Sequence, residues 1–257
     1  MSLFDMDGMT AVITGSTKGI GKAIAQRMAE HGANVVVSSR KEDACIQVAD
    51  EINRDWAKKG NKAIPIPCHI AHKEQLQALI DKSMAAFGRI DVLVCNAAVN
   101  PYYGPSRDIP DSAFDRVMES NVRSNFWLCH MAAKHMVARK SGSIIIMSSV
   151  GGVKGHTTLG VYGISKAADI QLARVLAAEY GPDNIRANAI APGLVRTDFA
   201  RALWEDEANL KLRTATTPLR RIGDPDEIAG MAVLLGSKAG SFLTGQTILI
   251  DGGVTIA

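Results

Sequence analysis

A tyrosine and a lysine that could exchange a proton with a substrate lie four residues apart, at Tyr162 and Lys166. In a helix this spacing puts both side chains on one face, so the lysine ammonium can stand beside the phenol. A free phenol has a pKa of about 10, and a neighbouring positive charge favours its ionised form. The pair therefore suits general acid/base chemistry on an alcohol or carbonyl oxygen.

A hydroxyl group precedes this pair, at Ser149, just after the apolar run 143–147. The run is typical of a buried strand, and a hydroxyl at its end can hold a substrate oxygen as charge develops on it. Ser148 is the alternative, although its side chain should point the other way if the strand continues. Neither serine lies in a Gly-x-Ser-x-Gly elbow, which argues against a serine hydrolase.

A glycine-rich segment near the start of the chain could bind a phosphate group. It follows an apolar run and consists of Gly15, Ser16, Thr17, Lys18, Gly19, Ile20 and Gly21. Glycines allow a tight turn and a close approach to a pyrophosphate, and the N-terminus of the following helix favours an anion. The G-x-x-x-G-x-G spacing differs from the commoner G-x-G-x-x-G, and no Gly-Lys-Ser/Thr of a Walker loop follows.

The end of the second apolar run carries Ser39 and Arg40 where an NAD-binding chain would carry an acid. An arginine there can clamp a 2′-phosphate, and Lys18 would add a second positive charge. Ser39 could add a hydroxyl. The expected cofactor is therefore NADP(H), with NAD(H) less favoured.

These segments fit an alternation of short apolar strands and longer helices. Strands are expected at 10–14, 34–39, 63–68, 92–95, 143–147, 185–190 and 246–250. Helices are expected at 19–31, 42–59, 72–87, 111–139, 162–180, 198–212 and 225–237. The pattern predicts an α/β fold, a doubly wound, Rossmann-type parallel sheet of seven strands with helices on both faces, in a single domain over residues 1–257. Such sheets bind ligands beyond the carboxyl ends of their strands.

Over essentially its whole length the chain resembles the single-domain short-chain dehydrogenase/reductases. The matching motifs are the loop 14–21, Asn96-Ala97-Ala98, Asn121, Ser149 with Tyr162 and Lys166, Pro192-Gly193 and Asp251-Gly252-Gly253. Segments 96–101, 191–195 and 199–204 carry a closer likeness to NADP-dependent carbonyl reductases of the dehydrogenase/reductase member 4 type.

The resemblance implies a catalytic set of Asn121, Ser149, Tyr162 and Lys166. In that set Asn121 holds a water on the path to the lysine, and Lys166 also holds the nicotinamide ribose. The resemblance further implies cofactor contacts from Tyr162, Asn96, Ala97, Ala98, Pro192, Gly193, Val195 and Thr197. The family usually has an aspartate after the third strand; here His69-Ile70 occupies that place, so a main-chain group is expected to contact the adenine.

A substrate lid is expected at about 194–218, with an apolar face from Phe199, Leu203 and Trp204. The other walls are expected from Val99, Val150, Gly151 and His156, of which His156 is a candidate extra acid/base. An apolar ketone, aldehyde or alcohol is the favoured substrate, interconverted by hydride transfer. The alternatives are a 3-oxoacyl-thioester reductase and a non-catalytic NADP(H)-binding sensor.

Composition argues against several other classes of protein. The net charge is only +3 and the charges are scattered, so no nucleic-acid partner is expected. The apolar runs are too short for a membrane span, and the start of the chain has no secretory leader, so a cytoplasmic location is expected. Four separated cysteines predict reduced core residues and no metal site. The helix 162–180 is apolar nearly all round, which predicts a homotetramer, or failing that a dimer.

Overall fold

The computed structural model describes residues 2–257, and seven parallel strands form one sheet in the order β3-β2-β1-β4-β5-β6-β7. The strands are β1 (Thr10–Thr14), β2 (Asn34–Ser38), β3 (Ala63–Pro65), β4 (Val92–Cys95), β5 (Gly142–Met147), β6 (Ile185–Pro192) and β7 (Thr247–Ile250). The strand order reverses between β1 and β4, which is where a doubly wound sheet opens a ligand crevice. The predicted Rossmann-type parallel sheet is confirmed.

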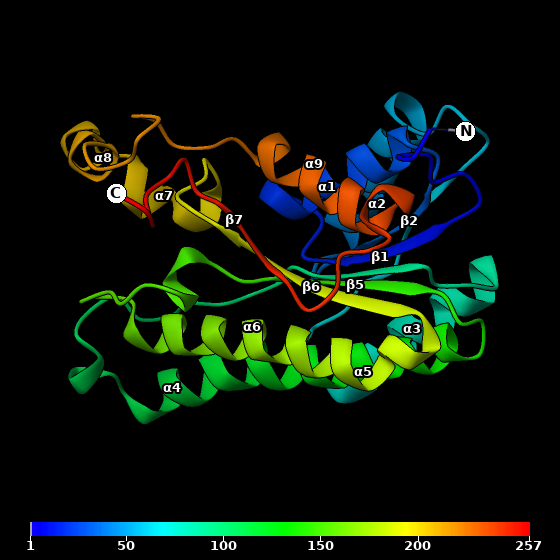
Figure 1. Ribbon diagram of the computed structural model, residues 1–257, viewed down its shortest axis with the longest axis horizontal. Coiled ribbons are helices and arrows are strands. Elements are labelled where there is room, and N and C mark those ends of the chain that lie inside the picture. The colour runs from blue at the N-terminus through cyan, green and yellow to red at the C-terminus, as the bar shows by residue number, and fades with distance from the viewer. Residues whose placement is uncertain (1) are drawn as a thin grey trace.

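Helices cover both faces of the sheet, as Figure 1 shows. One face carries α1 (Gly19–Glu30), α2 (Glu42–Asp55) and α9 (Pro225–Gly236). The other carries α3 (Lys73–Phe87), α4 (Asp111–Val117), α5 (Ser124–Val137) and α6 (Gly160–Tyr180). Successive residues of a strand point to opposite faces, so Ala11 and Ile13 join one core cluster and Val12 joins the other.

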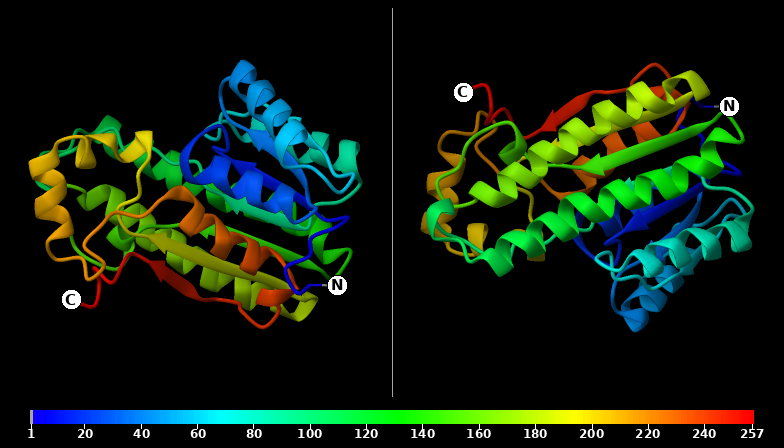
Figure 2. Two further views of the ribbon diagram at one scale, coloured as in Figure 1. Left: turned by 90° about the horizontal axis from the view of Figure 1, so that it is seen from above. Right: turned by 90° about the horizontal axis from the view of Figure 1, so that it is seen from below.

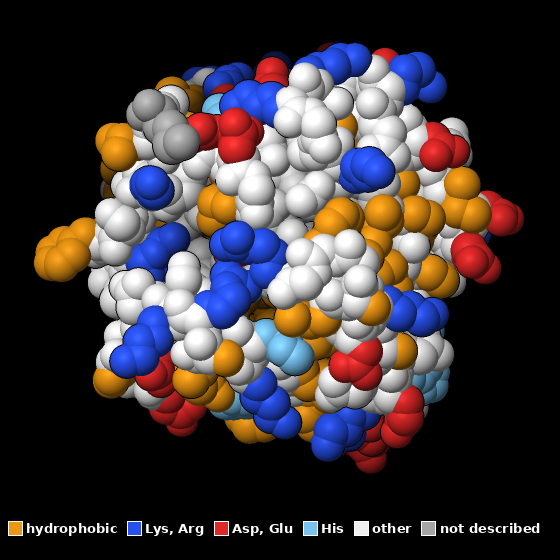
Figure 3. Space-filling view, turned by 90° about the vertical axis from the view of Figure 1, so that its right-hand side faces the viewer, with side chains coloured by type: hydrophobic (Ala, Val, Ile, Leu, Met, Phe, Trp, Pro, Cys, Tyr) orange, Lys and Arg blue, Asp and Glu red, His pale blue; other side chains and the backbone are white. Residues whose placement is uncertain are grey.

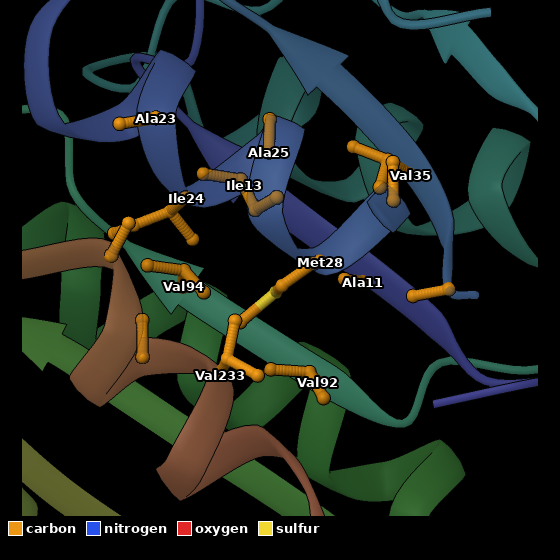
Figure 4. Packing of buried hydrophobic residues seen from close by; sticks show 14 of the residues in the cluster. Ala11, Ile13, Ala23, Ile24, Ala25, Met28, Val35, Val92, Val94 and Val233 are labelled. Carbon is orange, nitrogen blue, oxygen red and sulfur yellow. The ribbon is translucent and has the colours of Figure 1, made fainter. Parts of the chain in front are cut away.

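Close packing fixes α1 and α9 on the same face of the sheet. In Figure 4, Met28 of α1 lies between Val92 of β4 and Val233 of α9. All three side chains are almost completely buried. A core packed to this density leaves little freedom for the loops that connect its strands to its helices.

The third strand is shorter than predicted, because it ends at Pro65 and not at Cys68. Pro65 and Pro67 have no N–H donors, and they occupy positions whose N–H groups would face away from β2, which is tolerated at the edge of a sheet. Ile66 N still donates to Val37 O at 2.9 Å, and Cys68 N donates to Ser39 O at 2.9 Å. The chain therefore stays beside β2 without forming a regular strand.

Two predicted helices are divided. The expected helix 111–139 contains a π-helical segment, Met118–Arg123, which separates α4 from α5. The expected helix 198–212 is divided into a short turn, Asp198–Ala200, then α7 (Arg201–Trp204) and α8 (Glu207–Thr214). Asp206 starts α8 anew, because its backbone is extended and its Oδ1 accepts a hydrogen bond from Asn209 N at 2.7 Å.

No helix within residues 2–257 is both long enough and apolar enough to cross a membrane. Figure 3 shows the end of the molecule opposite α7 and α8, where lysine and arginine side chains gather near the middle with acidic side chains towards the edges.

A buried carboxylate, Asp91, holds the amino end of β4. Asp91 is 3% exposed and accepts hydrogen bonds from Thr10 N at 2.8 Å and from Arg89 Nε at 2.7 Å. It also pairs with Arg139 at the end of α5. One side chain thus ties β1, β4 and α5 together.

We expect Asp91→Ala to lower the free energy of unfolding by about 2–4 kcal/mol, because it leaves a buried N–H and two guanidinium groups without their acceptor. Urea denaturation followed by circular dichroism measures the change. Asp55→Ala is the matched control, since Asp55 pairs with Arg54 at the exposed surface. Its effect should stay below about 1 kcal/mol. Equal losses for the two variants would contradict the assignment.

Candidate active site

The predicted site residues meet at the carboxyl ends of β1, β4, β5 and β6. Both views of Figure 2 place α7 and α8 beyond these strand ends, on the same side as the C-terminus. The expected lid segment therefore lies over the crevice that the reversal of strand order opens.

The loop after β1 has the shape of a phosphate cradle. Gly15 and Gly19 have φ angles of 65° and 55°, which favour glycine. A Cβ on Gly21 would lie 2.4 Å from the carbonyl oxygen of Gly15 and 2.5 Å from Asn96 Nδ2. No side chain caps the start of α1, and no acid lies in its first turn. The first turn of α1 can thus face an anion, and the loop fits the pyrophosphate of a dinucleotide.

Several predicted cofactor residues brace this cradle from behind. Asn96 Nδ2 donates to Thr14 O at 2.9 Å and to Gly15 O at 3.1 Å. Thr14 Oγ1 accepts hydrogen bonds from the main-chain N–H groups of Asn96 and Ala97. Ser16 Oγ donates to Ile13 O at 2.7 Å and accepts from Ser38 N at 2.9 Å. The structure therefore gives the side chains of Asn96 and Ser16 a loop-holding position.

The end of β2 brings together the residues predicted to recognise the adenosine part of the cofactor. Arg40 is exposed, and Ser39 Oγ lies 3.3 Å from Cys45 Sγ. The hydrogen bond from Cys68 N to Ser39 O places the neighbouring His69 near the end of β2. Burial lowers the pKa of His69, and the charges of His72 and Arg40 lower it further. Ile70 packs against the core, which leaves its main chain for a ligand.

The beginning of the expected lid segment lies next to the glycine loop. A Cβ on Gly19 would be 3.2 Å from Thr197 Cγ2, and Lys18 Nζ lies 3.7 Å from Asp198 Oδ2. Both members of this ion pair are exposed, so it contributes little stability and Lys18 stays available to an anion. The Val195 side chain is buried in the core, so only its main chain can reach a ligand.

The turn after β6 has little room for side chains. Pro192 ends the strand, and Gly193 N donates to Ile250 O at 2.9 Å. A Cβ on Gly193 would lie 2.8 Å from the Cα of Asp251. This contact accounts for a glycine at the predicted bend.

Ser149 and Tyr162 are neighbours, and the Ser149 hydroxyl works to lower the pKa of the phenol. Ser149 Oγ also accepts from Gly151 N at 3.1 Å, which fixes the hydroxyl at the start of the turn Val150–Gly152. Ser148 is buried and donates its hydroxyl to Lys166 O at 2.8 Å. Of the two candidate serines, Ser149 is therefore the one that faces the phenol.

The ammonium of Lys166 is held from two sides. Its Nζ donates to Met147 O and to Asp169 Oδ2, both at 2.8 Å, and lies 5.7 Å from the centroid of the Tyr162 ring. Burial raises the pKa of Tyr162, Lys166 opposes that effect, and Asp169 reinforces it, so the pKa stands above its usual value. The charge of Lys166 thus lowers the pKa of the phenol, and the carboxylate of Asp169 offsets part of that effect.

Asp169 was not among the predicted site residues. The signal was present, because an aspartate three residues after Lys166 lies on the same side of a mostly apolar helix. An acid on the buried face of a helix requires a partner, and the nearest cation on that face is the lysine.

Asn121 lies in the π-helical segment between α4 and α5, a kind of interruption that is frequent at functional sites. Its Oδ1 accepts from Val99 N at 2.8 Å, and its Nδ2 donates to Val99 O at 3.0 Å and to Ser165 Oγ at 3.1 Å. The side chain thus ties the loop after β4 to α6. The predicted water on the path to Lys166 stays a prediction.

Of the predicted pocket walls, Phe199 lies near the phenol, and Gly151 and His156 lie near Ser149. The Phe199 ring is 54% exposed and its centroid lies 6.1 Å from that of Tyr162. A Cβ on Gly151 would touch both Ser149 Oγ, at 3.5 Å, and His156 Cδ2, at 3.6 Å. Leu203 is half-buried, and Trp204 Nε1 donates to Thr197 O at 3.0 Å, so this end of the wall is tied to the lid's own backbone.

The four cysteines, Cys45, Cys68, Cys95 and Cys129, are buried and free, as core residues. No group of three or more potential ligand side chains within residues 2–257 could hold a metal ion.

The sequence profile of a family described as enoyl-(acyl carrier protein) reductase matches residues 15–255. The chain belongs to the short-chain dehydrogenase/reductase family. It is 38% identical over 248 residues to dehydrogenase/reductase SDR family member 4 from Bos taurus, covering 96% of this chain and 88% of the relative.

Solved structures agree with this assignment. A gluconate 5-dehydrogenase from Burkholderia cenocepacia in complex with NADP and tartrate is 34% identical, with a TM-score of 0.93 and coverage of 99% of this chain and 98% of the other. A 7α-hydroxysteroid dehydrogenase with NADH and 7-oxo glycochenodeoxycholic acid is 36% identical, with a TM-score of 0.91 and coverage of 98% and 96%. The protein is therefore an oxidoreductase of this family, whose relatives bind nicotinamide cofactors and act on an alcohol or carbonyl carbon.

We expect Gly21→Ala to weaken dinucleotide binding by at least about tenfold, because the new methyl group would push the Gly15 carbonyl and the Asn96 amide apart. Quenching of tryptophan fluorescence during titration with the reduced cofactor measures the affinity. Gly230→Ala is the matched control, since a Cβ at that helical position meets nothing within 4 Å. Unchanged affinity in Gly21→Ala would show that the cradle is not the binding site.

Proposed function

We propose that the protein is an NADP(H)-dependent carbonyl reductase that interconverts a ketone or aldehyde and its alcohol, with Tyr162 as the general acid/base. The observation that carries this proposal is the pairing of Tyr162 with Ser149, whose hydroxyl works to lower the pKa of the phenol. The pair stands at the carboxyl ends of the strands, with the ammonium of Lys166 near the ring. A sensor that only bound the cofactor would have no use for this arrangement.

In the reductive direction, the bound reduced nicotinamide supplies a hydride to the carbonyl carbon. Tyr162 donates its phenolic proton to the carbonyl oxygen, and the Ser149 hydroxyl donates a hydrogen bond to that oxygen as negative charge develops. Lys166 favours the phenolate that is left, and it would also hold the ribose of a bound nicotinamide cofactor. In the oxidative direction Tyr162 removes the proton of the alcohol.

The proposed preference for NADP(H) rests on the charges at the end of β2. Arg40 is exposed beside Ser39, and the sequence has no acid there to hold the two ribose hydroxyls of NAD. Its guanidinium matches a 2′-phosphate, and Lys18 stands in the neighbouring loop. The relatives do not decide the preference, since one contains NADP and the other NADH.

The proposed substrate is an apolar carbonyl compound or alcohol. Phe199 faces Tyr162, and Leu203, Val99 and Val150 add apolar surface. The relatives act on substrates as different as a sugar acid and a bile acid, so the walls of this pocket and not the family decide the substrate.

We further propose a cytoplasmic homotetramer, with no nucleic-acid or membrane partner. Its support is the outer side of the α4, α5 and α6 layer, which Figure 2 shows from below. Phe114, Phe126, Ile164 and Val175 are exposed there. Leu249 of the edge strand β7 and Phe242 are exposed elsewhere. Two separate apolar surfaces are what a tetramer with two kinds of interface requires.

We expect Tyr162→Phe to lower kcat at least about 100-fold with little change in cofactor affinity, because the ring remains and only the proton donor is lost. Oxidation of NADPH is followed at 340 nm with a panel of ketones, aldehydes and 3-oxoacyl thioesters, which also separates the two enzyme alternatives. Tyr180→Phe makes the same change at the far end of α6 and should keep full activity. Unchanged turnover in Tyr162→Phe would refute the mechanism.

We expect Arg40→Leu to weaken NADPH binding by about 10-fold or more and to change NADH binding far less, because only NADPH carries the 2′-phosphate. Isothermal titration with each cofactor gives both affinities. Arg54→Leu, at an exposed site on α2, removes the same charge elsewhere and should leave both unchanged. An equal loss for the two cofactors would count against the 2′-phosphate role of Arg40.

A further inference from the structure

We propose that Asp169 is a positioning residue for this reaction, whose buried carboxylate holds Lys166 and cancels part of the ammonium charge that reaches Tyr162. The inference rests on the proposed acid/base role of Tyr162 and adds a member to the site.

The ion pair between Asp169 and Lys166 is completely enclosed. Asp169 is 0% exposed and Lys166 is 2% exposed, and Asp169 Oδ2 lies 2.8 Å from Lys166 Nζ. Asp169 Oδ1 accepts a second hydrogen bond from Asn125 Nδ2 at 2.9 Å. Burial raises the pKa of Asp169, and the charge and hydrogen bond of Lys166 and the hydrogen bond of Asn125 oppose that rise. Because both carboxylate oxygens accept from N–H donors, the geometry fits the ionised form of Asp169.

Stability alone does not account for such a pair. Removing two charges from water costs several kcal/mol per ion, and an apolar pair of similar volume is often at least as stable. The surrounding helix is mostly apolar, so an apolar residue would suit position 169. A carboxylate at this place therefore points to a role in the charge balance of the site.

The three side chains follow one another along α6. Tyr162, Lys166 and Asp169 lie on successive turns, so the ammonium stands between the phenol and the carboxylate. Nζ is held at the carboxylate side, where Met147 O also accepts from it at 2.8 Å. The phenol thus faces an ion pair with no net charge and not an isolated cation.

The pKa directions agree with this geometry. Burial, the largest single effect, works to lower the pKa of Lys166, but Asp169 together with Tyr162 and Cys95 raises the pKa above its usual value, so the lysine stays charged. Burial raises the pKa of Tyr162, the charge of Lys166 lowers it, and Asp169 raises it again. Loss of the negative charge should therefore lower the pKa of the phenol.

The other groups that face this pair carry no competing charge. Cys95 of β4 and Cys129 of α5 lie with their sulfur atoms 3.7 Å apart. Their hydrogen bond and burial raise the pKa of the Cys129 thiol. Asn125 of α5 and the carbonyl group of Met147 on β5 are uncharged. Asp169 is therefore the group whose charge can be removed without substituting Ser149, Tyr162 or Lys166.

The test is the pH dependence of kcat in the reductive direction, with NADPH and an active carbonyl substrate at saturation. Tyr162 must be protonated to act as the acid, so activity is present below its pKa and is lost as the pH rises through it. Asp169→Asn keeps the shape and removes the charge. We expect this falling limb to move to lower pH by about one pH unit, the size of a shift caused by one close charge.

Two controls accompany this variant. Asp169→Glu keeps the charge and should keep the parental limb. Asp226→Asn removes a carboxylate that pairs with Arg27 at the surface and should also leave the limb in place. Where Asp169→Asn fails to fold by circular dichroism, the smaller Asp169→Ser replaces it, with the same expected shift.

A limb that stays in place, or moves to higher pH, overturns the proposal, even if kcat or thermal stability falls. The Tyr162→Phe variant separates this failure from failure of the proposed function. If Tyr162→Phe is inactive while the Asp169 variants keep the parental limb, only the role of Asp169 is refuted. If Tyr162→Phe stays active, the proposed function itself fails.

Discussion

The hydrogen bonds between Asn96 and the turn after β1 join the two segments that flank the reversal of strand order. Through them, the end of β4 dictates the shape of the glycine loop after β1. The space between these segments is filled to contact distance, so the loop cannot relax without displacing the asparagine. The remaining parts of the site are arranged outward from this fixed point, on strands whose register is set by the same sheet.

The site also depends on polar groups that are buried at a cost and matched with partners. Along α6, Ser165, Lys166 and Asp169 lie in the interior, and each reaches a group on another element or on the next turn. Unmatched, each would cost between one and several kcal/mol. The partners come from α5, β5 and the π-helical segment, so the helix that carries the reacting phenol is located by these polar contacts as well as by apolar packing.

Much of the fold follows from pattern alone. The strands at Thr10–Thr14 and Val92–Cys95 have the predicted bounds, because short apolar runs between turn residues are typical of buried strands. The π-helical segment could not be predicted, because the helical period of residues 111–139 continues through it. The new start at Asp206 was missed because a capping acid looks the same as a surface acid in a sequence.

The predictions for the site divide in the same way, into those that follow from the sequence pattern and those that require the fold. Motif order places Ser149, Tyr162 and Lys166 together, since they follow strands or share a helix face. The bracing position of Asn96 and the burial of Asp169 depend on which side of each segment faces inward. The residues 162–180 are apolar nearly all round, and this pattern draws attention away from Asp169, the buried acid of α6. The contacts of Asn96 across the sheet become visible only with the fold, whereas the spacing of Lys166 and Asp169 was already a signal in the sequence.

The close approach of Thr197 to Gly19 links the two parts of the site that are expected to bind the cofactor and the substrate. The Trp204 indole donates a hydrogen bond to the carbonyl of Thr197. The expected pocket wall and the segment beside the glycine loop are therefore both held by Thr197. A displacement that admits one ligand alters the compartment of the other. Such mechanical linkage couples the binding of the two ligands through Thr197.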